Sequence, residues 1–169
     1  MIDSLNLKKI TDNVFKYEDS LSVLNPQMIE HIKYIAHTHP MQRARINFHH
    51  SDEALVHEMI IAMTNGTIVE PHQHLNKCES FHLMEGTVRI GFINEDGIIM
   101  NIVELSKDKT EYYRLNTPDY HIVVPISEMV VIHEVTNGPF LKEENTFNLN
   151  LSTKKVNMIR KTIRSWRIE

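Results

Sequence analysis

The sequence predicts an all-β protein, an antiparallel sandwich or barrel, with one helix before its strands. Eight short apolar segments follow one another between residues 56 and 151, and turn-forming pairs such as Asn65-Gly66 and Glu85-Gly86 separate them. No segment of helical periodicity lies between them, which is typical of sandwiches and barrels. The predicted strands are 56–63, 79–84, 87–93, 98–105, 111–115, 121–124, 129–135 and 146–151.

The predicted helix covers residues 26–38. Asn25 can cap it, Pro26 suits the first helical position, and apolar residues recur at three- and four-residue steps behind them. His39-Pro40 should end the helix, because the residue before a proline is pushed out of the helical region.

Three regions follow from this pattern. Residues 1–40 are predicted as an N-terminal extension, whose first 24 residues indicate at most a short strand or loop, and residues 41–151 as the β-barrel. Residues 152–169 form a basic C-terminal extension with six basic residues and one acidic residue. Charge runs of this kind are usually solvated, so we expect the extension to pack on its own acidic body rather than to bind an anionic partner. A short amphipathic helix is predicted there from three apolar residues, Val156, Ile159 and Ile163.

The composition excludes several classes of protein. A chain of 169 residues can bury one core, and a net charge of -4 argues against a general nucleic-acid binder. No apolar run reaches the roughly 18 residues that a membrane span needs, and the N-terminus lacks the apolar core of a secretory signal. Cys78 is the only cysteine, which fits a reducing compartment, so we expect a cytoplasmic protein.

Histidine is overrepresented, with eleven residues, and its most informative cluster lies near the centre of the chain. His72 and His74 are two residues apart, so on a strand both imidazoles project from the same face. Glu79 follows across a short turn and can point into the same cavity. Two imidazoles and one carboxylate on one wall suit a divalent transition metal. His121, at the start of a later apolar strand, is a candidate fourth ligand.

Each of these residues also has a simpler interpretation. A single His-x-His pair on a strand is more often a surface or core pair than a metal site. A charged, inward-facing Glu79 is costly in a small barrel, however, unless it is paired or bound to a metal. The combination therefore favours one divalent metal ion, and its ligand types suit iron, manganese, nickel or zinc.

The pattern Gly66-x5-His72-x-His74-x4-Glu79-x6-Gly86 resembles the first signature motif of the cupin superfamily without a gap. The second cupin motif is present in part, because Pro118-Asp-Tyr-His121 keeps the proline and the histidine but lacks the glycine. This resemblance implies a cupin barrel, also called a double-stranded β-helix or jelly roll, with a bound metal.

Longer phrases resemble one cupin family in particular. Lys77-Cys-Glu79-Ser-Phe-His82 and His133-Glu-Val-Thr-Asn-Gly-Pro-Phe140 are similar to the WbuC family of cupin-fold metalloproteins, over about residues 40–140. The resemblance implies a metal-bound barrel often encoded with genes for surface polysaccharide, the O-antigen of lipopolysaccharide. It implies no defined reaction.

Three residues are candidates for acid–base catalysis beside the metal. Such an enzyme needs a proton donor or acceptor near an open metal position, and the candidates are His57, on the strand before the motif, and His133 and Glu134, on a later one. Alternation along a strand places His133 and Glu134 on opposite faces, so only one of them can serve the cavity. By the same rule, His82 faces away from the cavity if Glu79 faces into it. A surface position is the alternative for His57.

Arg45, Tyr113 and Arg114 are candidates for substrate binding, and Arg43 is a further one. A guanidinium offers a rigid fork of donors to a carboxylate or phosphate, and a tyrosine hydroxyl can donate to a sugar-like ligand. The alternatives are a surface ion pair for each arginine and simple packing for the tyrosine.

These observations predict a metal-dependent enzyme, an isomerase, epimerase or dioxygenase, that acts on a small polar or sugar-derived molecule. The alternative is a sugar-binding or other small-molecule-binding metalloprotein without catalysis, because the fold supports both. A homodimer is also expected, since outward apolar residues such as Met84 would otherwise be exposed.

Overall fold

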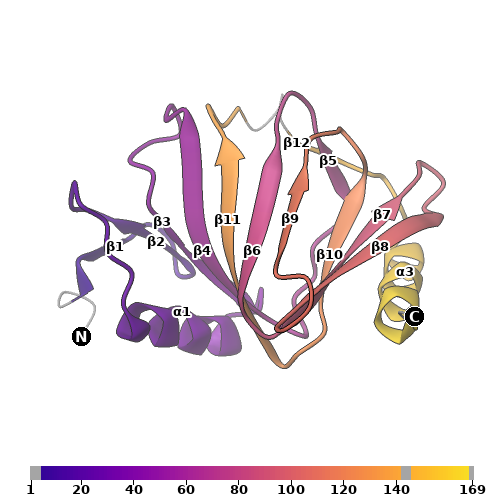
Figure 1. The fold of residues 1–169 in the computed structure, drawn as a ribbon, viewed down its shortest axis with the longest axis horizontal. Helices are drawn as coiled ribbons and strands as arrows, with labels where there is room; N and C mark the ends of the chain where they lie inside the picture. Colours follow the sequence, from indigo (N-terminus) through magenta and orange to yellow (C-terminus); the bar gives the residue numbers. More distant parts are fainter. Residues whose placement is uncertain (1–4, 142–145, 168–169) are drawn as a thin grey trace.

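Two β-sheets packed face to face form the body of the protein (Figure 1). A computed structural model describes residues 5–141 and 146–167. The larger sheet has the strand order β1 (Leu7–Lys9), β2 (Val14–Tyr17), β3 (Arg43–Asn47), β4 (Val56–Thr64), β11 (Met129–Asn137), β6 (Glu79–Glu85) and β9 (Tyr112–Leu115). The smaller sheet has the order β12 (Thr146–Asn148), β5 (His72–His74), β10 (His121–Pro125), β7 (Thr87–Ile93) and β8 (Ile99–Ser106).

All eight strands predicted from the sequence are present, with ends shifted by up to three residues, so the all-β class is confirmed. Strand β3 was not predicted. Only Ala44 and Ile46 supply its apolar alternation, and two arginines separate and precede them. The structure explains this strand by its neighbours, because it pairs antiparallel with β4 and parallel with β2. Strands β1 and β2 thereby extend the larger sheet at one edge.

The core between the sheets follows the alternation of the strands. On β6, Phe81 and Leu83 are buried in this core, whereas His82 is exposed on the outer face. The predicted inward face of β6 is therefore confirmed. Since Glu79 has the same parity as Phe81, the register of this strand carries a carboxylate into the barrel.

Helix α1 (Pro26–Thr38) occupies the residues predicted to be helical. The Met28 amide donates a hydrogen bond of 3.0 Å to the side chain of Asn25, and the helix ends at His39. Its buried residues pack with Ala44 and Ile46 on the outer face of β3 and β4. Because the helix covers this side of β3, the arginines of β3 point the other way, toward the barrel interior.

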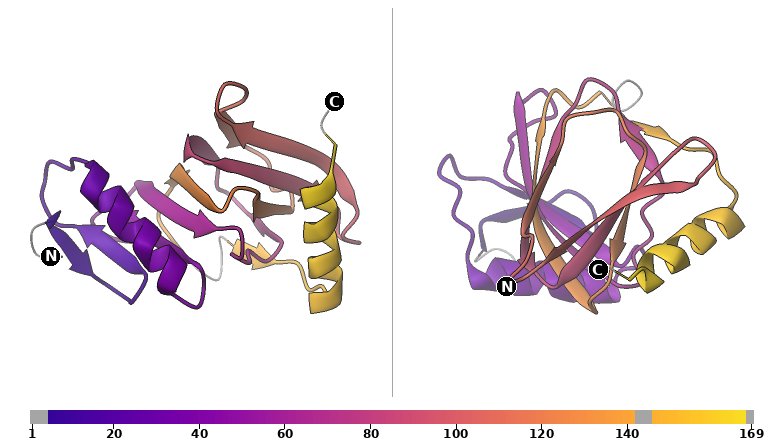
Figure 2. Two further views of the ribbon diagram at one scale, coloured as in Figure 1. Left: turned by 90° about the horizontal axis from the view of Figure 1, so that it is seen from below. Right: turned by 45° about the vertical axis from the view of Figure 1, so that its right-hand side comes forward.

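A second helix, α3 (Thr153–Ser165), lies at the opposite end of the molecule from α1 (Figure 2). Its apolar face packs on β7 and β10, and Ile163 fits where Gly91 has no side chain, since a Cβ there would lie 2.4 Å from Ile163 Cδ1. Arg160 donates to the carbonyl of Thr67 at 2.7 Å, and Arg89 donates to the carbonyl of Ile163 at 2.7 Å. The basic C-terminal helix thus contacts its own barrel.

Met84 does not support the expected dimer. It packs against the cluster of apolar residues beneath α1, within the same chain, rather than lying on a bare outer face. No described helix is long and apolar enough to cross a membrane.

The packing of α3 yields a test of the fold. Ile163→Ala removes a fully buried side chain, and we expect it to lower the free energy of unfolding by about 2–5 kcal/mol because a cavity remains over Gly91. Lys161→Ala, on the exposed face of the same helix, is the control and should change it by less than about 0.5 kcal/mol. Urea denaturation followed by circular dichroism measures both, and equal stabilities would contradict the docking of α3.

Candidate metal centre

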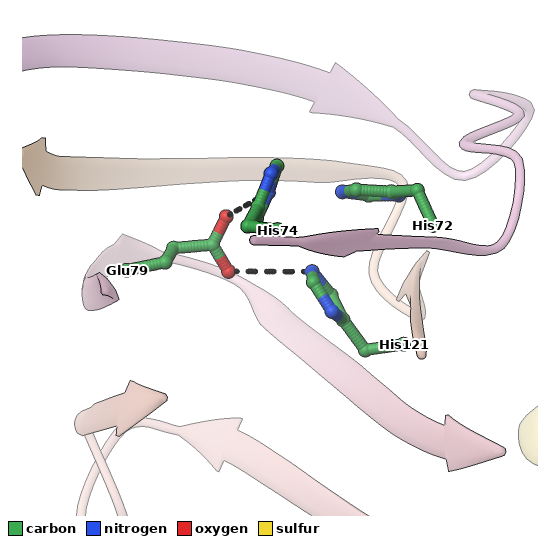
Figure 3. A group of neighbouring side chains, drawn as sticks. All are labelled: His72, His74, Glu79 and His121. Atoms are coloured by element: carbon green, nitrogen blue, oxygen red, sulfur yellow. Dashed lines mark ion pairs between the residues drawn. The ribbon is translucent and has the colours of Figure 1, made fainter. Parts of the chain in front are cut away.

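Three strands bring the four predicted ligands together (Figure 3). His72 and His74 come from β5, Glu79 from the start of β6, and His121 from the start of β10. The β5–β10 ladder places His121 directly opposite His72. One ligand atom from each of the four residues lies within 4.8 Å of the others, which is close enough for all four to contact one ion.

Glu79 lies between two of the imidazoles (Figure 3). Its Oε2 is 3.4 Å from His74 Nε2, and its Oε1 is 3.5 Å from His121 Nε2. The Tyr113 hydroxyl donates a hydrogen bond of 2.5 Å to Oε1. Burial alone would raise the pKa of Glu79, but the hydrogen bonds from His74 and Tyr113 and the nearby His121 lower it to about 2. The centre therefore holds a carboxylate that stays negative at neutral pH.

Hydrogen bonds on the far side of the imidazoles orient them. His72 Nδ1 donates to the carbonyl of Glu70 at 2.8 Å, and His121 Nδ1 donates to the carbonyl of Asp119 at 3.1 Å. Since a carbonyl only accepts, these bonds fix the proton on Nδ1 and leave Nε2 facing the centre. His74 Nδ1 lies 3.2 Å from Thr146 Oγ1. Such outer contacts are the usual supports of metal-ligating histidines.

The residues present fit a divalent metal ion. His121 Nε2 is buried and makes no hydrogen bond with any described residue, although buried polar atoms are nearly always satisfied. Burial and the neighbouring His121 lower the pKa of His72 to about 4, so its ring is neutral near pH 7. Three imidazoles and one carboxylate are a donor set for first-row transition metals, and an ion among them would satisfy the buried nitrogen.

Three residues of the cluster, His72, His74 and Glu79, form part of the wall of a cavity of about 680 Å³ inside the barrel, and His121 lies behind them. This volume is in the range of small-molecule sites. An apolar surface that includes Met59, Ile61 and Met63 lines the cavity beside the cluster. The cavity is therefore suited to a small molecule that reaches the four ligands.

The structure separates the three candidate catalytic residues. Glu134 lines the cavity, but His133 lies on the outer face, where its Nε2 is 3.1 Å from Glu58 Oε1. His57 also lines the cavity, where it is 3% exposed and stacks on His49 with ring centroids 4.1 Å apart. Since β11 alternates as expected, the cavity receives the carboxyl of Glu134 and not the imidazole of His133.

The three candidate substrate-binding residues are also separated. Arg45 lines the cavity. Tyr113 is buried, and its hydroxyl donates a hydrogen bond to Glu79. It therefore orients the Glu79 carboxylate instead of facing the cavity. Arg114 is exposed outside the cavity, where it donates to Asn116 Oδ1 at 2.8 Å and lies 3.0 Å from Cys78 Sγ.

Sequence reasoning missed several polar residues of the cavity wall, among them Asn47 and Lys77. Lys77 lies inside the metal motif, between His74 and Glu79, and its position in a turn gave it no pattern of its own. Asn47 follows Arg45 by two residues, as Arg45 follows Arg43. This spacing indicates that the three side chains share one face only if residues 43–47 are known to form a strand.

The register between β6 and β11 brings Glu134 close to the predicted ligands. On the β6–β11 ladder Thr136 is opposite Glu79 and Glu134 is opposite Phe81, so the two carboxyls are diagonal neighbours on one face. Diagonal neighbours of this kind are about 7–8 Å apart. Burial and the charge of Glu79 raise the pKa of Glu134 to about 8, against the opposing effect of nearby cations.

Comparisons with known proteins agree with this architecture. CapF, the capsular polysaccharide assembling protein from Staphylococcus aureus, superimposes with a TM-score of 0.51 at 20% identity, over 63% of this chain and 30% of CapF. The fold is that of a cupin. This cupin chain therefore spans less than a third of the length of CapF. Protein SO0799 from Shewanella oneidensis superimposes with a TM-score of 0.53 at 10% identity, over 97% of this chain and 90% of that protein.

The sequence comparisons name no activity for this chain. A family model described as a domain of unknown function, DUF6016, matches residues 24–105. No curated protein matches the chain.

The carboxyl of Glu134 yields a pH-dependent prediction for the metal-free protein. Its pKa of about 8 in the folded state lies above the usual 4.5, so the folded chain holds a proton that the unfolded chain releases between those values. The free energy of unfolding should therefore fall as the pH rises from about 5 to 8, and Glu134→Gln should reduce that fall by about 1 kcal/mol or more.

Urea denaturation across this pH range measures the effect. Glu128→Gln, an exposed carboxyl close to the start of β11, is the matched control and should follow the wild-type curve. If Glu134→Gln also followed that curve, the assignment of a raised pKa to Glu134 would be wrong.

Proposed function

We propose that this cupin is a metal-dependent enzyme that transfers a proton on a small polar, sugar-derived substrate, as isomerases and epimerases do. The observation that carries the proposal is that Glu134 lines one cavity together with three residues of the cluster, His72, His74 and Glu79. A proton carrier beside the centre favours proton transfer over the dioxygenase chemistry that the sequence also left open.

His72, His74, Glu79 and His121 are proposed to hold the ion, since their donor atoms converge within 4.8 Å. A divalent ion there would supply Lewis-acid polarisation of a carbonyl or hydroxyl oxygen. Tyr113 holds the Glu79 carboxylate in position through its hydrogen bond of 2.5 Å.

Glu134 is proposed as the group that takes up and returns the proton. A pKa of about 8 leaves both the acid and the carboxylate populated near neutral pH, which suits a residue that must act in both directions. The apolar wall around Met59 and Ile61 would limit the access of water to this proton. Arg45, which lines the cavity from β3 of the same sheet, is proposed to bind the substrate.

A role in surface-polysaccharide synthesis is the proposed context. The phrases around Lys77–His82 and His133–Phe140 resemble the WbuC family, and CapF, which shares the fold, is described as a protein of capsular polysaccharide assembly. A cytoplasmic location is part of this proposal, supported by Cys78, which is a free thiol.

Metal content tests the ligand set. The full chain purified without added metal or chelator should carry close to one equivalent of iron, manganese, nickel or zinc. The double variant His72→Ala, His74→Ala should lose it, because two of four donors are gone. The double variant His82→Ala, His133→Ala removes two histidines that pair across β6 and β11 on the outer face and should keep it.

Inductively coupled plasma mass spectrometry measures all three proteins. Equal metal content in both double variants would place the ion elsewhere.

Hydrogen exchange tests the proposed reaction. In deuterated water the metal-loaded protein should exchange a carbon-bound hydrogen next to the carbonyl or hydroxyl of its substrate, and NMR detects this in a panel of hexoses, 6-deoxyhexoses and their nucleotide-linked forms. Glu134→Gln should slow exchange about 100-fold or more and keep its metal. Exchange at the wild-type rate in Glu134→Gln would contradict the role of Glu134. Binding without exchange of any panel member would favour the non-catalytic alternative.

A further inference from the structure

Two arginines of β3 line the cavity and form no ion pair with a described residue. Arg43 and Arg45 are two residues apart and share one face of the strand, opposite to Ala44 and Ile46. Within residues 5–141 and 146–167 neither guanidinium forms an ion pair, and the one contact of Arg45 is with Met59 Sδ at 4.0 Å. Burial lowers the pKa of Arg43, and the neighbouring charge of Arg45 adds to the effect.

Asn47 continues the same face of the strand and also lines the cavity. Its side-chain oxygen is buried and makes no hydrogen bond with any described residue. Arg43, Arg45 and Asn47 therefore form a strip, the β3 strip, of two guanidiniums that make no ion pair and one amide oxygen that accepts no hydrogen bond from the described residues. An unsatisfied buried polar atom costs about 1–3 kcal/mol, which is a reason to expect a ligand there.

The balance of charge in the cavity is positive around this strip. Lys77 is a third cation of the wall, and its nearest aromatic partner is Phe140, 5.3 Å from Nζ to the ring centroid. Of the three acids in the wall, Glu79 is already engaged by two imidazoles and a tyrosine, and the pKa of Glu134 near 8 leaves it mostly neutral at pH 7. The third acid, Asp52, is exposed and forms no ion pair among the described residues. Arg43 and Lys77 are partly buried and Arg45 is exposed, and an anion in the cavity would supply charge that balances them.

The β3 strip and the ligand cluster lie on different parts of the cavity wall. In the larger sheet, β4 and β11 separate β3 from β6, which carries Glu79. Three strand spacings amount to about 14 Å along the sheet, and the arginine side chains shorten the free gap. A monosaccharide that carries a charged group could reach both places, with Glu134 on β11 between them.

We propose that the β3 strip binds an oxyanion group, a carboxylate or a phosphate, of a substrate whose polar end reaches the ligand cluster. The guanidiniums of Arg43 and Arg45 donate to the anion, and Asn47 Oδ1 accepts from a neighbouring hydroxyl of the same molecule. This inference deepens the proposed function and rests on it, since it assigns the substrate class to the same cavity.

Direct binding of simple anions tests the strip apart from any reaction. Isothermal titration calorimetry at pH 7 uses the full chain treated with chelator, with its metal content and circular dichroism spectrum recorded, so that an anion cannot bind through a metal. The probes are inorganic phosphate and malonate, with glycerol as the neutral control. One of the two anions should bind, and the stronger one distinguishes a phosphate from a carboxylate site.

Arg43→Gln, Arg45→Gln should weaken that binding about tenfold or more, because each charged hydrogen bond contributes about 1.5–3 kcal/mol. Lys109→Gln, Arg167→Gln removes the same charge from two exposed positions and should leave the affinity unchanged. Arg45→Gln alone gives the same comparison if the first double variant does not fold.

Two results would overturn the inference. One is the absence of phosphate and malonate binding to the folded wild-type chain, and the other is equal affinity in the cavity variant and the surface variant. Both differ from a failure of the proposed function, because loss of metal binding or of hydrogen exchange would leave the anion affinity of the metal-free chain unchanged.

Discussion

The burial of the Glu79 carboxylate is the constraint on which the rest of the site depends. This residue is 4% exposed, at the start of β6, inside a barrel whose other inward residues on that strand are apolar. A charge in that position is costly unless neighbouring groups stabilise it. Here the stabilising groups come from three other strands: His74 on β5, Tyr113 on β9 and His121 on β10. The need to balance one carboxylate thus ties the two sheets together at one end.

The sequence alone could predict that His72, His74 and Glu79 lie together. His72, His74 and Glu79 lie within eight residues, and period-two alternation is enough to put them on one wall. His121 required the second cupin motif, of which only the proline and the histidine are present. In the structure, the register of the β5–β10 ladder explains the position of His121, because it places His121 directly opposite His72.

The substrate side of the cavity was harder to predict. Arg43, Arg45 and Asn47 lie on a five-residue strand with two apolar residues, and its strand character comes from pairing with β2 and β4. The side chains of Tyr113 and Arg114 are both suited to binding a polar substrate. Their positions, however, depend on the faces of β9, since Tyr113 points inward and Arg114 points outward. Long-range pairing decides such positions, and a single sequence carries no direct signal of it. The same holds for Met84, which α1 covers from another part of the chain.

The cavity divides into two chemically different walls. At one, three imidazoles and a carboxylate bring their donor atoms together. The other holds two guanidiniums without an ion pair and an amide oxygen without a hydrogen bond among the described residues. Glu134 lies between them, on a strand that neighbours both β4 and β6. A binding protein would need only one of these walls, whereas a carboxyl with a pKa of about 8 between them is suited to moving a proton.

X-ray absorption spectroscopy of the purified full chain tests the central claim most directly, because it reports the atoms around the ion rather than its amount. The structure predicts a first shell of nitrogen and oxygen atoms at about 2.0–2.2 Å, with the outer-shell scattering of three imidazoles. A sulfur atom in the first shell, or the scattering of fewer than two imidazoles, would contradict the assignment of the ion to His72, His74, Glu79 and His121.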